Sequence, residues 1–286
     1  MTAGESRELE PGLYLVGTPI GNLADMTLRA IRVLKQADLI ACEDTRQTQK
    51  LLHHYGIETR LVSYHEHNEA SRAAQLVRDL EKGLRIAVVS DAGMPGISDP
   101  GFRLVSLAIE HGVLVFPVPG PAAFLAALVA SGLPTDSFCF RGFLPAKSGA
   151  RRRELEKIRA SDETQIYYEA PHRIKETLAD VVEVMGPGRP VVVARELTKV
   201  HEELLRGMVE DVAQILNARS EVKGEITLLI GKAAEGQWTP RGVSIRERVE
   251  QIMREDKLDE KAALKKVAKE RGISKSEVYR QLQMQK

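Results

Sequence analysis

Three loops rich in glycine and proline carry the residues best suited to bind a ligand. They cover residues 17–23, 90–101 and 119–123, and each follows an apolar run with the composition of a buried strand. In a parallel α/β sheet, ligands bind beyond the carboxyl ends of the strands, and these ends meet at one edge. The loops offer backbone groups, the carboxylate of Asp91 and few other charges. They therefore predict a single cleft for a small, polar, roughly neutral ligand.

Familiar cofactor and nucleophile fingerprints do not occur in the sequence. The stretch 17–21 lacks the Gly-x-Gly-x-x-Gly pattern, 142–148 lacks the second glycine of a phosphate-binding loop, and no Gly-x-Ser-x-Gly is present. These features argue against a Rossmann dehydrogenase, a P-loop ATPase and a serine hydrolase. His65 and His67 could share one face of a strand, but no third metal ligand is near them in the sequence. We expect them to line a cleft or to hydrogen-bond rather than to hold a metal.

The first half of the chain alternates between apolar runs and helical patterns about every 20–25 residues. The predicted strands of this half lie at 12–17, 38–42, 85–89 and 113–118. Such alternation predicts a mostly parallel sheet with covering helices. The second half places its apolar runs at 138–143, 165–169, 190–195, 202–207 and 224–231. Several of the connections between them are short enough for antiparallel pairing, so we expect a mixed sheet.

The predicted organisation is α/β, with two α/β domains followed by a small helical domain. The expected parts are a disordered tail at 1–11, α/β domains at 12–119 and 120–232, a linker at 233–242 and a helical basic domain at 243–286. Residues 241–286 hold 13 Lys or Arg against 8 Asp or Glu, a net charge of +5. Their last two predicted helices, joined at Gly272 with Ser274 as a cap, resemble a helix-turn-helix.

The overall composition is that of an ordinary soluble globular protein. The chain has 286 residues, 43% of them hydrophobic and 28% charged, and a net charge of +1. Nucleic-acid binding would therefore depend on local basic patches. The two cysteines, Cys42 and Cys139, lie far apart in apolar contexts, as expected for thiols in a reducing cytoplasm. We find no signal peptide and no apolar run near the ~18 residues of a membrane span.

The three loops, together with Tyr167–Glu169 and Gly224–Ile226, resemble the tetrapyrrole methylase superfamily. Members of that superfamily bind S-adenosylmethionine between two α/β domains, in a fold distinct from the Rossmann methyltransferases. The resemblance narrows to the type I methyltransferases of small-subunit ribosomal RNA. The segments that carry this narrower resemblance occur in the expected order at 17–23, 43–46, 90–93, 117–121, 142–145 and 194–199.

The resemblance covers residues 12–232, extends into the helical tail, and implies an activity and partners. The implied reaction is 2′-O-methylation of the ribose of cytidine 1402 in 16S rRNA of the small ribosomal subunit, by a homodimer. The residues that would hold S-adenosylmethionine are Pro19, Asp91, Gly93, Met94, Ala122, Ala123, Tyr168, Leu197 and Glu225. Met94 stands where we expect threonine in relatives, so a hydroxyl group at this position is not required.

A ribose 2′-hydroxyl is a poor nucleophile and needs a base, or a strong hydrogen bond, as its proton leaves. We assign the substrate side of the site to Glu43, Asp44, Arg46, Arg195 and Glu196. His65 and Glu169 are further candidate bases, and Lys199 is a further cation. Structural roles without catalysis remain open for these residues. The two acids at 43–44 could cap a helix and do nothing more. The pair at 195–196 could only join the domains, and Tyr167 and Tyr168 could only be core.

Contacts to RNA phosphates could come from Lys147 and Arg151–Arg153, which we predict to lie in a basic loop, and from the basic tail. Two other functions remain open. The same cofactor site could methylate a tetrapyrrole or another small molecule, although the basic segments would then have no role. The chain could also be a helix-turn-helix regulator with a ligand-sensing α/β body, although its segment Lys275–Gln283 is only weakly basic.

Overall fold

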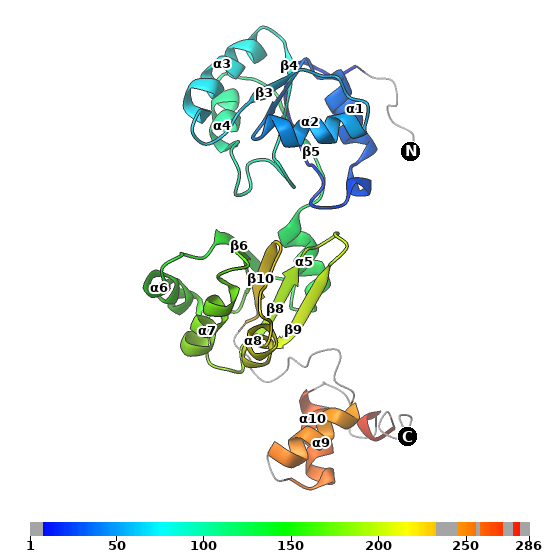
Figure 1. Cartoon of the computed structure of the whole chain (residues 1–286), viewed down its shortest axis with the longest axis vertical. Coiled ribbons are helices and arrows are strands. Elements are labelled where there is room, and N and C mark those ends of the chain that lie inside the picture. Colours follow the sequence, from blue (N-terminus) through cyan, green and yellow to red (C-terminus); the bar gives the residue numbers. More distant parts are fainter. Residues whose placement is uncertain (1–7, 233–244, 256–257, 271–276, 281–286) are drawn as a thin grey trace. The chain divides into compact units, whose positions relative to one another are not determined.

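The computed structural model describes residues 8–232, 245–255, 258–270 and 277–280 (Figure 1). The chain forms two compact units, Met1–Ala126 with Glu196–Glu202, and Ala127–Arg195 with Glu203–Lys286. The division falls inside helix α5 (Ala123–Ser131), whereas the sequence placed it between residues 119 and 120. Most of the expected tail at 1–11 and all of the expected linker lie outside the described residues.

The first unit is built on a five-stranded sheet in the order β3-β2-β4-β1-β5, and every pair in it is parallel. Its strands are β1 (Gly12–Val16), β2 (Leu39–Cys42), β3 (Leu61–Ser63), β4 (Arg85–Val89) and β5 (Val115–Val118). The predicted parallel sheet is therefore confirmed. The central strands are buried almost throughout, as strands covered on both faces must be.

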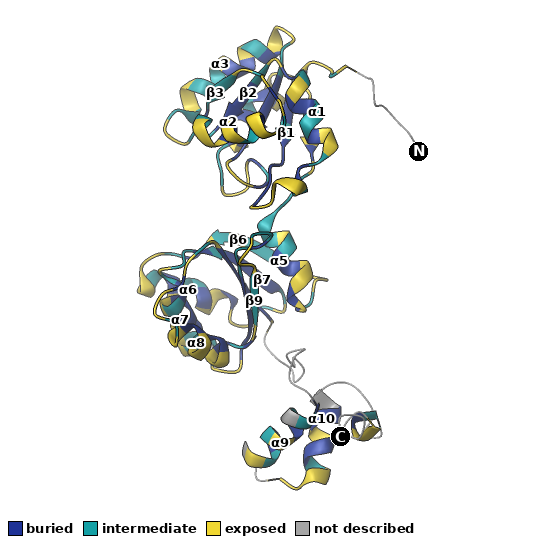
Figure 2. Ribbon diagram, turned by 45° about the vertical axis from the view of Figure 1, so that its right-hand side comes forward, coloured by how far each residue is buried: buried dark blue, intermediate teal, exposed yellow. Residues whose placement is uncertain are grey.

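Helices lie on both faces of this sheet (Figures 1 and 2). They are η1 (Leu23–Asp25), α1 (Leu28–Gln36), α2 (Thr45–His54), α3 (Glu69–Glu81) and α4 (Phe102–Glu110). Alternate strand residues point to opposite faces, so one core contains Val16 and Val89 with α1 and α2, while Leu13 and Val88 join α3 and α4. Thr27 caps α1 by accepting a hydrogen bond from the amide of Ala30 at 3.0 Å.

The second unit contains a five-stranded mixed sheet in the order β6-β7-β10-β8-β9. Its strands are β6 (Phe138–Phe143), β7 (Thr164–Glu169), β8 (Pro190–Arg195), β9 (Glu203–Met208) and β10 (Ile226–Ile230). Only β6 and β7 pair in parallel, and the other three pairs are antiparallel. The predicted mixed sheet is confirmed. Its helices are α5, α6 (Ser148–Ile158), α7 (Ile174–Met185) and α8 (Val209–Asn217).

Helix α6 corrects the predicted basic loop at 147–153. Arg151 lies on the inner side of this helix with only 1% of its side chain exposed, and its Nε donates to the Asp180 carboxylate at 2.6 Å. Arg152 pairs with the same carboxylate at 2.7 Å, and Ser148 donates its hydroxyl to it at 3.0 Å. The prediction that Arg151 contacts RNA phosphates was wrong, because its side chain is buried and paired to α7, whereas Arg152 is 43% exposed and its contact with RNA stays a prediction.

Replacing Asp180 by asparagine is expected to lower the free energy of unfolding by about 3–5 kcal/mol. The buried Arg151 would keep its charge but lose its close carboxylate partner, and the exposed Glu176 carboxylate would remain at 3.8 Å. Chemical denaturation of the purified variant measures this change. Glu183→Gln is the matched control, since Glu183 pairs only with the partly exposed Arg152 and should cost less than about 1 kcal/mol. Equal losses of unfolding free energy in the two variants would show that the buried ion pair is no more important for stability than the exposed one.

Two helices that follow the second sheet in the chain, α9 (Ile245–Glu255) and α10 (Glu260–Glu270), confirm the predicted helical region. They bury apolar residues against each other in a cluster that also includes Val278 from the following segment. The residues from the two helices are Ile245, Val249, Ile252, Ala263, Leu264, Val267 and Ala268. The spacing of the first three is that of one helix face. The turn of the predicted helix-turn-helix lies outside the described residues, and only 277–280 of its last helix is described. No helix in the described ranges is long and apolar enough to cross a membrane.

Candidate active site

The first two ligand loops lie against each other in the first unit. Thr18 and Gly93 form an antiparallel bridge, in which the Thr18 amide donates to the Gly93 carbonyl at 2.9 Å and the Gly93 amide donates back at 3.1 Å. The Thr18 hydroxyl also donates to the Ser90 carbonyl at 3.2 Å. Pro19 follows directly and is buried. The loops at 17–23 and 90–101 therefore share one edge of the sheet, as predicted.

The third loop meets the first through two glycines. A Cβ atom added to Gly17 would lie 2.7 Å from the Cα of Gly120 and 2.7 Å from the sulfur of Met94. A Cβ atom added to Gly120 would lie 2.8 Å from the Cα of Gly17. Neither position has room for a side chain, so the two backbones run in direct contact beneath Met94. We call Gly17, Gly93, Met94 and Gly120 the glycine cradle.

Helix α5 begins immediately after this cradle. Ala122 and Ala123 are half-buried at its start, and the Ala126 amide donates to the Ala122 carbonyl at 2.9 Å. The first amides of a helix have no partner within the helix, and small side chains leave them accessible to a ligand. The cofactor residues predicted from 19 to 123 thus come from loops that the structure brings together.

The acids at the start of α2 are joined to the cofactor loop. The amide of Asp44 donates to the carboxylate of Asp91 at 3.2 Å. Asp44 is the N-cap of α2, because its carboxylate accepts from the amide of Arg46 at 2.8 Å and pairs with the Arg46 guanidinium at 3.1 Å. This pairing lowers the pKa of Asp44. The predicted capping role is real, and it also fixes Glu43 next to the loop that carries Asp91.

A group of carboxyls gathers here, and one member was not predicted. The pKa of Glu43 is raised, first by burial and then by the nearby charge of Asp91, and His65 opposes this shift. Burial, followed by the charge of Glu43, raises the pKa of Asp99 to about 6, although a hydrogen bond with Ser90 opposes the shift. Asp99 is not among the predicted site residues, because its distance of 56 residues from Glu43 hides their proximity in the sequence.

The raised pKa of Asp99 predicts a pH-dependent stability. Between the ordinary aspartate pKa of 3.8 and about 6 the folded state keeps a proton that the unfolded state loses, so stability falls as the pH rises through this window. Asp99→Asn should remove this slope and stabilise the protein by about 1–2 kcal/mol at pH 7, with no gain at pH 4. Denaturant unfolding across this range measures it. The exposed Asp136→Asn serves as the control, and an unchanged slope in Asp99→Asn would contradict the assignment.

The segment after β8 belongs to the first unit and reaches the first loop. The Cγ of Lys199 occupies the space that a side chain on Gly21 would need, and the Lys199 ammonium pairs with Glu196 at 2.8 Å. Glu196 and Thr198 both have positive φ, 51° and 65°, and they flank the buried Leu197. Non-glycine residues adopt this conformation rarely and at some energetic cost, so the segment holds a specific shape. Leu197 and Glu196 therefore belong to the same unit as the glycine cradle.

The remaining predicted residues lie together at one end of the second sheet. Tyr168 is opposite Thr227 on β10, and its ring lies 4.9 Å from that of Phe140, edge to face. Arg195 ends β8 opposite Ile226, and Glu225 directly precedes β10. Because β10 runs antiparallel to β7 and β8, its start lies beside their ends. Tyr168, Arg195 and Glu225 are thus brought to one edge.

Arg195 contacts residues of the second unit. Its Nε donates to Glu203 at 3.0 Å, and a second nitrogen donates to the carbonyl of Lys223 at 3.2 Å. Glu203 also pairs with Arg219 at 2.6 Å, and Arg219 and then Arg195 lower the pKa of Glu203 to about 2. Glu196 pairs with Lys199, so each of Arg195 and Glu196 has a partner within its own unit.

Glu169 is not suited to be the base. Its side chain is fully buried, accepts from the hydroxyl of Thr177 at 2.7 Å and pairs with Arg173 at 2.8 Å. The rings of His65 and His67 lie 5.9 Å apart, and among the described residues no group of three or more His, Cys, Asp or Glu could hold a metal ion. His65 stays beside Glu43, and its Nδ1 is buried with no hydrogen-bond partner.

Comparison of the sequence with known families identifies a class of methyl-transferring proteins. The family model described as Tetrapyrrole (Corrin/Porphyrin) Methylases matches residues 12–213. The chain belongs to the tetrapyrrole methylase family and is a methyltransferase.

Relatives with high identity carry one common name. "Ribosomal RNA small subunit methyltransferase I" of Halalkalibacterium halodurans is 48% identical over 280 residues, covering 96% of this chain and 96% of its own length. The protein of the same name from Bacillus subtilis is 46% identical and covers 93% and 92%. Among solved structures, uroporphyrin-III C-methyltransferase from Thermus thermophilus matches with a TM-score of 0.53 and 22% identity, over 78% of this chain and 95% of its own. A structure of that enzyme with S-adenosyl homocysteine has a TM-score of 0.55 at 22% identity, over 78% of this chain and 98% of its own.

Proposed function

We propose that this protein transfers a methyl group from S-adenosylmethionine to the 2′-hydroxyl of cytidine 1402 in 16S rRNA of the small ribosomal subunit. The observation that carries the proposal is the extent of the similarity. The ribosomal RNA methyltransferase of Halalkalibacterium halodurans matches 96% of this chain, whereas the uroporphyrin-III enzyme covers 78% of it with 95% of its own length. The similarity to the rRNA enzyme thus extends into the C-terminal helices, which favours an RNA acceptor over a tetrapyrrole.

S-adenosylmethionine is the cofactor, and the residues of the first unit fit it. In the glycine cradle two backbones meet without side chains, and the exposed carboxylate of Asp91 can accept hydrogen bonds from a polar ligand. In our proposal the first unit holds it through Pro19, Asp91, Gly93, Met94, Ala122, Ala123 and Leu197, and the second unit adds Tyr168 and Glu225. The sulfonium charge already activates the methyl group, so these residues chiefly align the donor with the acceptor.

The acceptor hydroxyl must lose its proton as the new bond forms. Glu43 fits the role of base because burial and Asp91 raise its pKa, which makes its carboxylate a better proton acceptor than an exposed one. Asp44 holds Arg46 at the same position, and Arg46 can bind a phosphate next to the acceptor ribose. Arg195 and Glu196 complete the proposed substrate side. Glu196 holds the ammonium group of Lys199, which can stabilise the developing negative charge on oxygen.

Methyl transfer from labelled S-adenosylmethionine to four acceptors tests the proposal. Purified small ribosomal subunits, naked 16S rRNA, DNA and uroporphyrinogen would be offered in parallel, after cofactor binding has been shown by calorimetry. We expect label in rRNA and none in DNA or uroporphyrinogen. Transfer to uroporphyrinogen, or no transfer to either form of RNA, would reject the proposal.

A further inference from the structure

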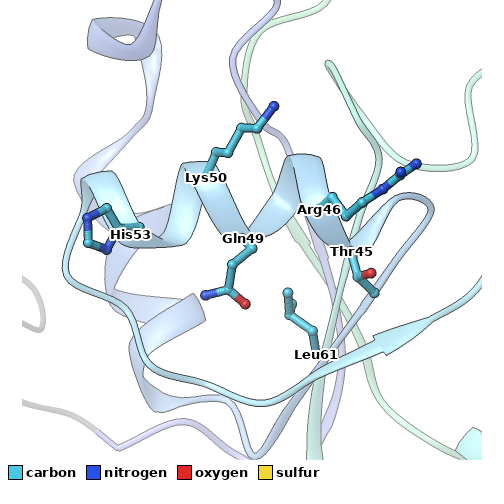
Figure 3. Close-up of a pocket in the computed structure, with 6 residues that line it drawn as sticks. All are labelled: Thr45, Arg46, Gln49, Lys50, His53 and Leu61. Carbon is cyan, nitrogen blue, oxygen red and sulfur yellow. The ribbon is translucent and has the colours of Figure 1, made fainter.

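An open hollow lies between helix α2 and strand β3, outside the glycine cradle. Its lining residues are Thr45, Arg46, Gln49, Lys50, His53 and Leu61 (Figure 3). Figure 3 shows Arg46, Lys50 and His53 spaced along the helix, and Gln49 extending from it toward Leu61, the first residue of β3. The opposite face of α2 buries Thr48 and Leu52 in the core of the unit. The hollow is therefore a feature of the exposed face of this helix.

The lining is a row of cationic and polar groups at helical spacing. Arg46, Lys50 and His53 follow one another at intervals of four and three residues, so the row extends over about 10 Å. Helix α2 contains no acidic residue. The row is local, because residues 1–240 hold 28 Lys or Arg against 32 Asp or Glu. The row is therefore a cationic surface on a body whose net charge is −4.

The charge of Lys50 is available to a ligand. Its ammonium donates to the amide oxygen of Gln47 at 3.1 Å, which is a neutral partner, and Lys50 is exposed. Arg46 is 88% exposed and pairs with the N-cap carboxylate of Asp44 at the very start of the helix. An anion bound in the hollow would gain these cations without breaking a buried interaction.

The row begins at the proposed acceptor side of the active site. Asp44, directly before Arg46, donates its amide to Asp91 in the cofactor loop at 3.2 Å. Because α2 runs back along the sheet from the carboxyl ends of the strands, Lys50 and His53 lie progressively farther from that edge. A chain of phosphates that passes the acceptor site would meet the cations Arg46 and Lys50 and then the imidazole of His53 in sequence.

We propose that this hollow binds the backbone phosphates of the RNA strand next to the nucleotide that is methylated. The inference rests on the proposed function. A linear row of cations about one helical turn apart fits a polyanion with regularly spaced charges, and the amide of Gln49 can donate to a phosphate or ribose oxygen. Contacts of this kind carry no sequence information, so they set the register of the strand and not the choice of cytidine.

The salt dependence of RNA binding by Lys50→Gln tests this inference. Removing one cation that neutralises a phosphate should make the negative slope of log K against log salt shallower by about 1. The variant binds RNA more weakly at low salt, and this difference in affinity from the unchanged protein should shrink about threefold between ~50 and ~200 mM salt. Filter binding of labelled 16S rRNA measures this with the full chain. Lys50→Arg keeps the charge and should restore the slope. Lys35→Gln, an exposed lysine in the last turn of α1, is the matched control and should leave the slope unchanged.

The outcomes separate this inference from the function on which it rests. If the unchanged protein methylates no RNA, the proposed function fails. If it methylates rRNA and Lys50→Gln keeps the original slope, only the assignment of the hollow is overturned. An equal change in Lys50→Gln and Lys35→Gln would also overturn it, because the effect would then reflect total charge. Affinity for S-adenosylmethionine should stay the same in all three variants, which shows that the fold is intact.

Discussion

Gly17→Ala is expected to lower methyl transfer at least about 100-fold, because displacement of a reacting group by about an ångström has effects of this size. The added Cβ atom would lie 2.7 Å from the Cα of Gly120 and 2.8 Å from its nitrogen, and neither backbone atom can move away as a flexible side chain would. Separating the two backbones would open the glycine cradle and move Met94. We also expect a loss of stability of about 1–3 kcal/mol from overpacking.

Calorimetric affinity for S-adenosylmethionine, initial rates and thermal unfolding together measure this effect. Gly149→Ala is the control, because nothing lies within 4 Å of a Cβ atom at Gly149 and its φ is not positive. It should keep full activity. Native cofactor affinity in a folded Gly17→Ala protein would show that the contact between the loops does not form the cofactor site.

Deletion of residues 241–286 is expected to reduce methylation of small ribosomal subunits about 10- to 100-fold, with cofactor affinity unchanged. The segment carries a net charge of +5, and every phosphate that the protein no longer neutralises weakens its binding to RNA in a salt-dependent way. The two sheets with their covering helices should remain folded, since the cores described for them contain no residue of α9 or α10. Their intact cofactor site would still bind S-adenosylmethionine.

Steady-state rates on small subunits and calorimetry with S-adenosylmethionine distinguish the two effects of this deletion. Raising the concentration of subunits should recover much of the missing rate, because the defect lies in binding and not in the chemical step. Equal activity of the shortened and the full protein at low subunit concentration would show that the C-terminal helices have no role in RNA recognition.

The parts of the fold that depend on local pattern could be predicted from the sequence. The alternation of buried strands and amphipathic helices indicated the parallel sheet, and the short connections indicated the mixed one. The loops at 17–23 and 90–101 could be placed on one edge because parallel strands share their direction. The bridge between Thr18 and Gly93 is the direct result.

Features that depend on residues distant in sequence could not be predicted. Arg151 looked like a solvent-exposed cation because its partner Asp180 is 29 residues away on another helix. Asp99 was not predicted as a site residue because its burial and its proximity to Glu43 arise only in the folded chain. The homodimer and the cytoplasmic location stay predictions, since neither follows from the fold of one chain.

The atom that receives the methyl group tests the central claim most directly. The 2′-hydroxyl is the nucleophile in alkaline cleavage of RNA, so a 2′-O-methyl group protects the next phosphodiester, whereas a methyl group on the base does not. Small ribosomal subunits treated with the protein and S-adenosylmethionine would be hydrolysed in alkali, and the 16S rRNA ladder read by primer extension. We predict one new gap in the ladder directly after cytidine 1402. Transfer of label to rRNA with an unbroken ladder, or a gap at another nucleotide, would contradict the account.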